Sequence, residues 1–245
     1  MIKYEFPLNE RTRKLLRLEQ LFNKTQTALL SSNKYNEYNI FERIFELMQT
    51  ASRTDLKVEL IQEVERKVIY IKKLKRTKLN DRLLIRLRKI KTGLEKATIQ
   101  PGFYFGNDKL LQEIKTRRDS PFGITSIDFP EFHYWLQNQT TQFKKDYLNK
   151  KLLSFSPIKD AIFSLLEILR AKEKILNVSA EAGVFQKKLD PRLKIDLVTI
   201  TAKKSLRSYP NISSNKYAIS IHFNDVKTQN QITKTINFKI SLSSL

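Results

Sequence analysis

Hydrophobic positions in the N-terminal part of the chain recur at intervals of three, four and seven residues, as the buried face of a helix requires. The first predicted helix follows Pro7-Leu8-Asn9-Glu10, and helical spacing resumes between Ile40 and Met48. Another helix opens at Ser156-Pro157, where Ser is expected to cap the helix and Pro to occupy its first turn. The apolar stripe of the first helix is Leu15, Leu18, Phe22 and Leu29.

Two further helical segments, residues 55–75 and 83–94, are separated by a polar interruption at residues 77–81. Because the connection is short, we expect the two helices to form an antiparallel hairpin. Beyond it, residues 101–106 predict an aromatic loop bounded by turns, and residues 108–117 predict a short helix. A segment dense in aromatic residues follows at 128–137.

After residue 174 the hydrophobic period changes to two, which is typical of strands with one buried face. Residues 224–231 link the last two alternating runs and predict a hairpin loop, and a less regular run lies between residues 176 and 185. We expect an antiparallel sheet of three or four strands, with one face packed and the other solvated. The alternating hydrophobic positions are Leu193, Ile195 and Leu197, then Tyr217, Ile219, Ile221 and Phe223, and finally Ile236, Phe238, Ile240 and Leu242.

This change of period predicts an α+β fold, with an N-terminal helical bundle followed by a small antiparallel β domain. The expected domains are residues 1–175, which are helical, and residues 176–245, which form the sheet. Hydrophobic residues make up 40% of the 245 residues, which is enough apolar material for a packed core.

Charge narrows the class of partner. The chain has 46 Lys and Arg against 25 Asp and Glu, a net charge of +21, so an anionic partner is expected. Nucleic acid, an anionic membrane surface and an acidic protein all fit this charge. The N-terminus has no apolar signal segment, and the most apolar stretch, residues 161–169, is about half as long as a membrane span. We therefore expect a soluble cytoplasmic protein that does not enter the membrane.

The predicted helical hairpin has the greatest local excess of charge. Residues 66–96 contain 13 Lys and Arg and only two acidic residues. One interpretation is a platform for the phosphate backbone of nucleic acid. The other is a solvated face without a partner, which is favoured because the basic residues fall on several sides of the helices and no aromatic residues alternate with them. On this basis nucleic acid is not the expected partner.

No motif in the chain indicates an enzyme. The sequence contains five Gly, and Gly102 and Gly106 fit neither dinucleotide-binding nor phosphate-loop patterns. The absence of Cys excludes thiolate catalysis and sulfur-based zinc sites, and His133 and His222 are the only histidines. We expect a binding protein without a metal or another cofactor. His133 lies among aromatic residues, as either a core histidine or the polar part of a peptide-binding groove.

Several segments together resemble the ZapD family of cell-division proteins. The similarity begins at Tyr4-Glu5-Phe6-Pro7-Leu8-Asn9-Glu10 and continues at residues 16–19 and 59–66. It is clearest in Phe129-Pro130-Glu131-Phe132-His133-Tyr134-Trp135-Leu136, and it returns at residues 206–213 and at Phe223. The resemblance implies a homodimer that binds the C-terminal tail of FtsZ, the tubulin-like division GTPase, and bundles its filaments. It also implies recruitment from the cytoplasm to the division site at mid-cell, with no metal and no cofactor.

The family's tail-binding residues can be carried over one position at a time. Lys109 keeps the charge of a family arginine but lacks its planar bidentate fork, and Ala218 and His222 stand where relatives carry arginine. His222 would make any contribution of the sheet to tail binding pH-sensitive. Phe132 and Tyr134 are offered as contacts for apolar side chains of the tail, whereas Trp135 is expected in the core. The resemblance thus implies tail binding by Arg17, Arg53, Lys109, His133, Lys216 and His222.

Overall fold

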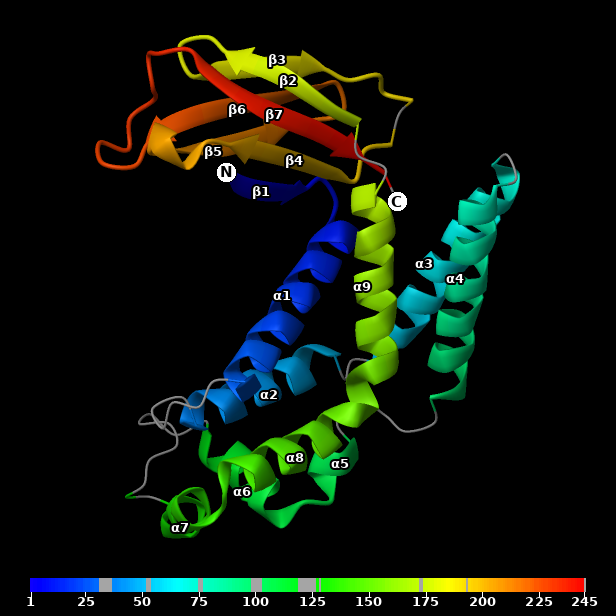
Figure 1. Cartoon of the computed structure of the whole chain (residues 1–245), viewed down its shortest axis with the longest axis vertical. Coiled ribbons are helices and arrows are strands. Elements are labelled where there is room, and N and C mark those ends of the chain that lie inside the picture. Colours follow the sequence, from blue (N-terminus) through cyan, green and yellow to red (C-terminus); the bar gives the residue numbers. More distant parts are fainter. Residues whose placement is uncertain are drawn as a thin grey trace. The chain divides into compact units, whose positions relative to one another are not determined.

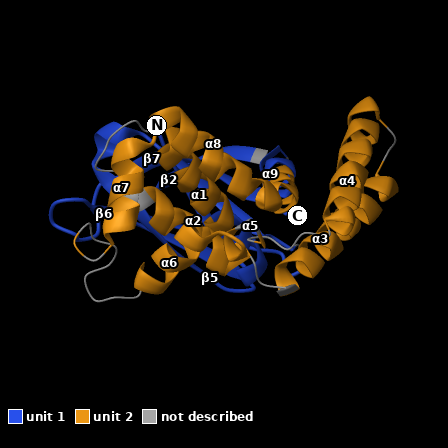
Figure 2. Ribbon diagram, turned by 90° about the horizontal axis from the view of Figure 1, so that it is seen from below, with its two compact units in different colours: residues 1–16, 165–245 blue, residues 17–164 orange. Residues whose placement is uncertain are grey.

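The computed structural model describes residues 1–30, 37–51, 54–74, 77–97, 103–118, 127, 129–171, 174–192 and 194–244. Helices occupy the N-terminal part and antiparallel sheets the C-terminal part, which confirms the predicted α+β class (Figure 1). The chain forms two compact units, residues 1–16 with 165–245 and residues 17–164 (Figure 2). The division into domains 1–175 and 176–245 stays a prediction, although the last helix ends at Ala171 and the next strand begins at Lys174.

In the structure, the apolar residues whose spacing predicts the first and the last helix are buried. Leu15, Leu18, Phe22 and Leu29 of the first helix are all buried, as are Ile158, Ile162, Leu165 and Leu169 of the last. One local prediction is wrong: the aromatic segment near residue 103 forms a short helix, not a loop. The helices are α1 (Glu10–Leu30), α2 (Glu37–Ala51), α3 (Thr54–Lys73), α4 (Lys78–Lys96), α5 (Phe103–Gly106), α6 (Lys109–Arg118), α7 (Pro130–Asn138), α8 (Thr141–Leu152) and α9 (Ser156–Ala171), with a 3₁₀ turn η2 (Leu153–Phe155) before α9.

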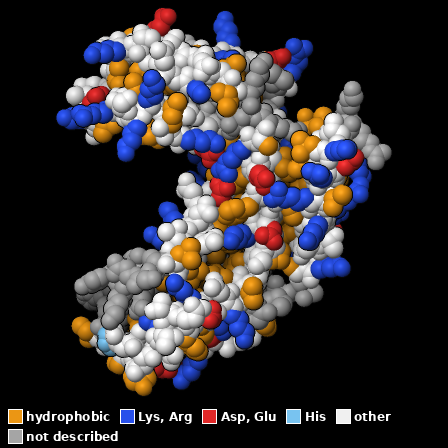
Figure 3. Space-filling model, in the orientation of Figure 1, with side chains coloured by type: hydrophobic (Ala, Val, Ile, Leu, Met, Phe, Trp, Pro, Cys, Tyr) orange, Lys and Arg blue, Asp and Glu red, His pale blue; other side chains and the backbone are white. Residues whose placement is uncertain are grey.

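The predicted helical hairpin is formed by α3 and α4. The ion pair between Lys91 and Glu65, at 2.6 Å, and the hydrogen bond from the Lys57 ammonium to the carbonyl of Ala97, at 2.9 Å, fix the two helices as antiparallel. Thr77 caps α4, because its hydroxyl accepts a hydrogen bond from the backbone N–H of Asn80. Lys and Arg side chains gather over the outside of this hairpin in the space-filling view (Figure 3).

The β region contains two sheets. The four-stranded sheet has the order β1-β4-β7-β2 and the three-stranded sheet the order β3-β6-β5, so the predicted sheet of three or four strands underestimates the β structure. The strands are β1 (Ile2–Pro7), β2 (Lys174–Ala180), β3 (Val184–Lys188), β4 (Leu197–Ala202), β5 (Ser208–Ser214), β6 (Ala218–Asp225) and β7 (Ile236–Ser243).

The two sheets pack face to face around one hydrophobic core. Phe238 of the four-stranded sheet contacts Phe223 and Phe185 of the other, with ring centroids 5.0 and 5.4 Å apart. Alternate residues of β4, β6 and β7 fill the space between the sheets, as strands with one buried face require. The alternation that predicts β6 and β7 is therefore confirmed. The predicted hairpin loop at residues 224–231 is confirmed too, since Asn224 and Gln231 form an antiparallel bridge, but the chain then crosses to the other sheet before β7 begins. The alternation at residues 193–197 predicts a strand too early in the chain, because β4 begins at Leu197.

A tight turn between β2 and β3 explains why two strands occupy a region where one irregular run is predicted. Ala182 and Gly183 both have positive φ angles, 48° and 76°, as a two-residue type I′ hairpin requires. Gly183 is also needed for space, because a Cβ atom there would lie 2.3 Å from the carbonyl oxygen of Ile232.

The strand β1 lies outside the predicted β region. It pairs antiparallel with β4, so residues near the start of the chain join a sheet whose other strands follow residue 173. Arg170 holds Glu5 of β1 through two hydrogen bonds of 2.8 and 2.7 Å. Asn9 donates to Asp196 at 2.6 Å and accepts the backbone N–H of Thr12 at 2.8 Å, which starts α1 directly after the strand.

Candidate functional site

Arg17 projects from the exposed side of α1. The neighbouring positions Leu15, Leu16 and Leu18 are buried, while Arg17 itself is exposed. Helical periodicity therefore explains its orientation, because the stripe that packs α1 leaves this position outside. A guanidinium in this setting offers a planar pair of donors to a carboxylate.

The helix α7 separates a buried aromatic face from an exposed polar face. Phe132 is fully buried, and its ring lies 4.8 Å from that of Phe41 in α2. Trp135 stacks on Phe132 and approaches Tyr147 of α8 at 5.4 Å, which confirms that Trp135 packs with the core. Phe132 is therefore wrong as a contact for apolar side chains of a ligand, since no part of it reaches the surface.

His133 and Tyr134 occupy the outward side of the same helix. Both are exposed, and 67% of Tyr134 is accessible. The interpretation of His133 as a core histidine is wrong, because His133 is exposed while Phe132 and Trp135 pack together on the buried side of the helix. His133 and Tyr134 together offer an imidazole and a phenol to a ligand.

Lys109 lies at the start of α6, where its position depends on the residue before it. Asp108 caps this helix by accepting the backbone N–H of Leu111 at 3.1 Å. The other carboxylate oxygen of Asp108 accepts a 2.7 Å hydrogen bond from Tyr147 and pairs with Lys151 at 2.6 Å. These contacts join the first turn of α6 to α8. Lys109 itself is 84% exposed, with Glu113 at 3.9 Å as a loose partner.

Electrostatics around Asp108 favour the charged form. Burial opposes ionisation, but hydrogen bonds from Lys151, Tyr147 and the backbone of Leu111 outweigh it, so the pKa of Asp108 is lowered. Burial raises the pKa of Tyr147, and its hydrogen bond to the Asp108 carboxylate raises it further. Asp108 lies 39 residues before Tyr147, and Lys151 is one helical turn beyond Tyr147, so no spacing signal predicts this cluster.

Replacing Asp108 tests how α6 is anchored. Asp108→Ala removes a helix cap and leaves the partly buried Tyr147 and Lys151 without their acceptor, so we expect a loss of about 1–3 kcal/mol in the free energy of unfolding. Because the folded-state pKa is lowered, this contribution is present above the unfolded pKa of about 3.9 and disappears as the pH falls through the folded value.

Urea unfolding of the wild type and Asp108→Ala at neutral and strongly acidic pH measures this effect. The difference between the two proteins should shrink as the pH falls below about 4. Asp160→Ala, at an exposed position in α9, serves as the control with the same change of charge. A difference that stays constant with pH would contradict the assigned role of the carboxylate.

Two of the predicted site residues lie in the unit that contains the sheets. Lys216 is exposed in the turn between β5 and β6, which is shaped by the Asn215 side chain accepting the N–H groups of Tyr217 and Ala218. His222 is half-buried on β6, with its ring 3.0 Å from the Ser220 hydroxyl and 3.3 Å from the Gln231 amide oxygen.

The predicted residues do not form a bonded cluster. Arg17, Lys109 and His133 belong to the helical unit, on α1, α6 and α7, and Lys216 and His222 belong to the other unit. Arg53 lies outside the described residues. Within the described ranges no hydrogen bond or ion pair joins any two of these five side chains, and all of them except the half-buried His222 are exposed.

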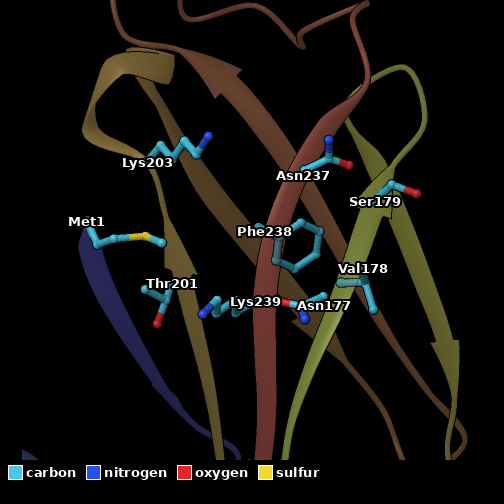
Figure 4. A pocket seen from close by; sticks show the side chains of 9 residues that line it. All are labelled: Met1, Asn177, Val178, Ser179, Thr201, Lys203, Asn237, Phe238 and Lys239. Atoms are coloured by element: carbon cyan, nitrogen blue, oxygen red, sulfur yellow. The ribbon is translucent and has the colours of Figure 1, made fainter.

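Two cavities lie away from all of these residues. One, of about 390 Å³, opens on the outer face of the four-stranded sheet, where the register aligns Thr201, Lys239 and Asn177 across three strands (Figure 4). The other, of about 320 Å³, lies in the helical unit between Phe22 of α1 and Phe155 of η2. None of the five described site residues lines either of these two cavities.

No group of three or more His, Asp or Glu residues in the described part of the chain could hold a metal ion. Among the helices of the described ranges, none combines the length and the apolar character needed to span a membrane.

Comparison with known proteins decides the family. The family model described as "ZapD: Cell division protein" matches residues 16–222. This chain belongs to the ZapD family. A ZapD from Azoarcus sp. (strain BH72) is 32% identical over 228 residues, covering 91% of this chain and 90% of that protein. The ZapD of Nitrosomonas europaea is 30% identical over 254 aligned residues, covering 100% of this chain and 96% of that protein. The predicted resemblance is thus confirmed, and with it a role in cell division.

Proposed function

We propose that this ZapD family member binds the C-terminal tail of FtsZ and cross-links FtsZ filaments into bundles, which promotes assembly and stability of the Z ring. The observation that carries the proposal is family membership over most of the chain, together with exposed basic residues at the positions that the resemblance assigns to tail binding. On this proposal the protein acts by binding, without catalysis and without a cofactor, and it is recruited to the division site at mid-cell.

The exposed cations suit a short peptide with acidic and apolar side chains. Arg17 would bind a carboxylate through two parallel hydrogen bonds, and Lys109 would act as a point charge. His133 would donate a hydrogen bond, and the adjacent Tyr134 would cover an apolar side chain of the tail. Arg53, Lys216 and His222 complete the proposed set of tail-binding residues, from the resemblance alone.

Cross-linking follows if the protein is a homodimer, because each dimer then presents two tail-binding sites. A filament is an array of identical tails, so two sites of modest affinity on one dimer produce strong overall binding. The net charge of +21 would also raise the rate of encounter with an acidic polymer.

Single substitutions test the proposed residues. Arg17→Ala and Lys109→Ala should each raise the Kd for a fluorescent tail peptide by about tenfold to hundredfold, because each loses at least one charge-assisted hydrogen bond worth about 1.5–3 kcal/mol. Fluorescence anisotropy measures the affinity, and thermal unfolding checks that each variant is folded.

The control is Lys115→Ala, which removes the same charge from an exposed position further along α6. It should bind the peptide like the wild type. If Arg17→Ala and Lys109→Ala also bind like the wild type, these residues do not hold the tail.

A further inference from the structure

One solvent-facing side of the helix α4 carries four basic residues along its length, with the exposed Ile85 between the second and third of them. Lys78, Arg82, Lys89 and Lys96 are separated by four, seven and seven residues, which places them within about 40° of one another around the helix. All four are exposed, whereas Leu87 and Leu94 on the opposite side are buried. The structure therefore places four of the basic residues of this segment in one line, the stripe, while others, such as Arg86 and Arg88, lie to either side of it.

Acidic residues of the hairpin neutralise other cations. Glu63 pairs with Arg66 at 3.0 Å, and Lys91 lies 2.6 Å from Glu65 and 3.5 Å from Glu95. Across the described ranges, the four stripe residues have neither an ion pair nor a hydrogen bond through their side chains. Part of the uncompensated charge of the hairpin thus points outward from α4.

The dimensions of the stripe fit a duplex. From Lys78 to Lys96 the helix rises about 27 Å, and a duplex of that length carries roughly 16 phosphate charges. Such a line of cations can replace condensed counterions along the backbone, which favours binding through their release.

Other anionic partners fit less well. Membrane adsorption by a helix requires a broad apolar face that enters the lipid. Leu87 and Leu94 of α4 are packed in the hairpin, and its exposed apolar residues Leu79 and Ile85 point about 120° apart and form no such face. Single-stranded nucleic acid is held largely by stacking on aromatic side chains, and α4 contains none. An acidic protein usually presents its carboxylates singly among other groups, whereas an unbroken line of charge is a property of a duplex.

We propose that the outer face of α4 binds the phosphate backbone of double-stranded nucleic acid, without regard to base sequence. This activity is separate from tail binding, because none of the stripe residues belongs to the proposed tail site. It also accounts for charge in a segment that carries none of the motifs on which the family resemblance rests.

Salt dependence of duplex binding tests the proposal with the full-length protein. Binding to a fluorescent duplex of mixed sequence, about 20 base pairs long, is measured between about 50 and 200 mM salt. Four phosphate contacts predict a slope of about −3.6 for the logarithm of the association constant against that of the salt concentration. Arg82→Gln/Lys89→Gln should flatten the slope to about −1.8 and weaken binding by roughly 10- to 100-fold near 0.1 M salt.

The matched control is Lys150→Gln/Lys188→Gln, which removes the same two charges from exposed positions in α8 and β3. It should keep the wild-type slope, and both double variants should bind the tail peptide normally. Equal slopes for the two double variants, or no duplex binding by the wild type, would overturn the proposal. Binding of anionic lipid vesicles but not duplex, lost in Arg82→Gln/Lys89→Gln, would assign the stripe to a membrane surface instead.

Discussion

Polymerised FtsZ that lacks its C-terminal tail is expected to leave this protein in the supernatant, whereas the full-length polymer carries it into the pellet. The proposed site recognises only the tail, and the polymer supplies the multivalency that strengthens weak single contacts by about 10²- to 10⁴-fold. Removing the tail removes both the contact and the array, so the loss of co-sedimentation should be nearly complete.

Free tail peptide provides the internal control for that experiment. Because the peptide is monovalent, a large excess should release the protein from the full-length polymer and dissolve the bundles. Co-sedimentation with the tail-less polymer that equals co-sedimentation with the full-length polymer would contradict the proposed function. The Arg82→Gln/Lys89→Gln variant should still pellet with full-length polymer. The tail-binding proposal and the nucleic-acid proposal can therefore fail independently of each other.

The second large effect concerns stability. Phe132→Ala removes a fully buried ring that packs between Phe41 and Trp135, so it leaves a cavity in the core of the helical unit. We expect the free energy of unfolding to fall by about 3–5 kcal/mol, the usual cost of removing a buried aromatic ring. Urea unfolding followed by far-UV circular dichroism measures the change.

The neighbouring residue supplies the matched control. His133→Ala truncates an exposed side chain on the same turn of α7, so its stability should stay within about 0.5 kcal/mol of the wild type. Its affinity for the tail peptide should fall instead. A Phe132→Ala variant as stable as His133→Ala would show that the aromatic cluster does not support the fold.

Local periodicity explains which elements the sequence predicts. A helix such as α1 or α4 buries its own stripe, and a strand such as β6 buries alternate residues, so each leaves a short-range pattern. Strand pairing leaves no such pattern. The partnership of β1 with β4, about 190 residues away, and the crossing between β6 and β7 depend on the packing of two sheets.

The arrangement of the candidate site is even harder to predict from local patterns in the sequence. Helical spacing around Phe132 is consistent with an outward His133 once the helix is known, yet the aromatic residues on both sides suggest burial equally well. Nothing in the order of residues brings Asp108 to Tyr147 and Lys151, because that contact arises from the packing of α6 on α8. The choice of Arg17 and Lys109 rests on family resemblance, since many exposed cations of this chain look alike in sequence.

The position of β7 within its sheet has a consequence for the order of folding during synthesis. Residues 17–164 form a continuous segment, so the helical unit can fold as soon as that segment leaves the ribosome. The four-stranded sheet cannot close then, because β7 lies between β4 and β2 and is made last of its strands. Until β7 is made, β2 has no partner within its sheet and β4 is paired only with β1, so a chaperone or a rapid rate of elongation would protect these open edges.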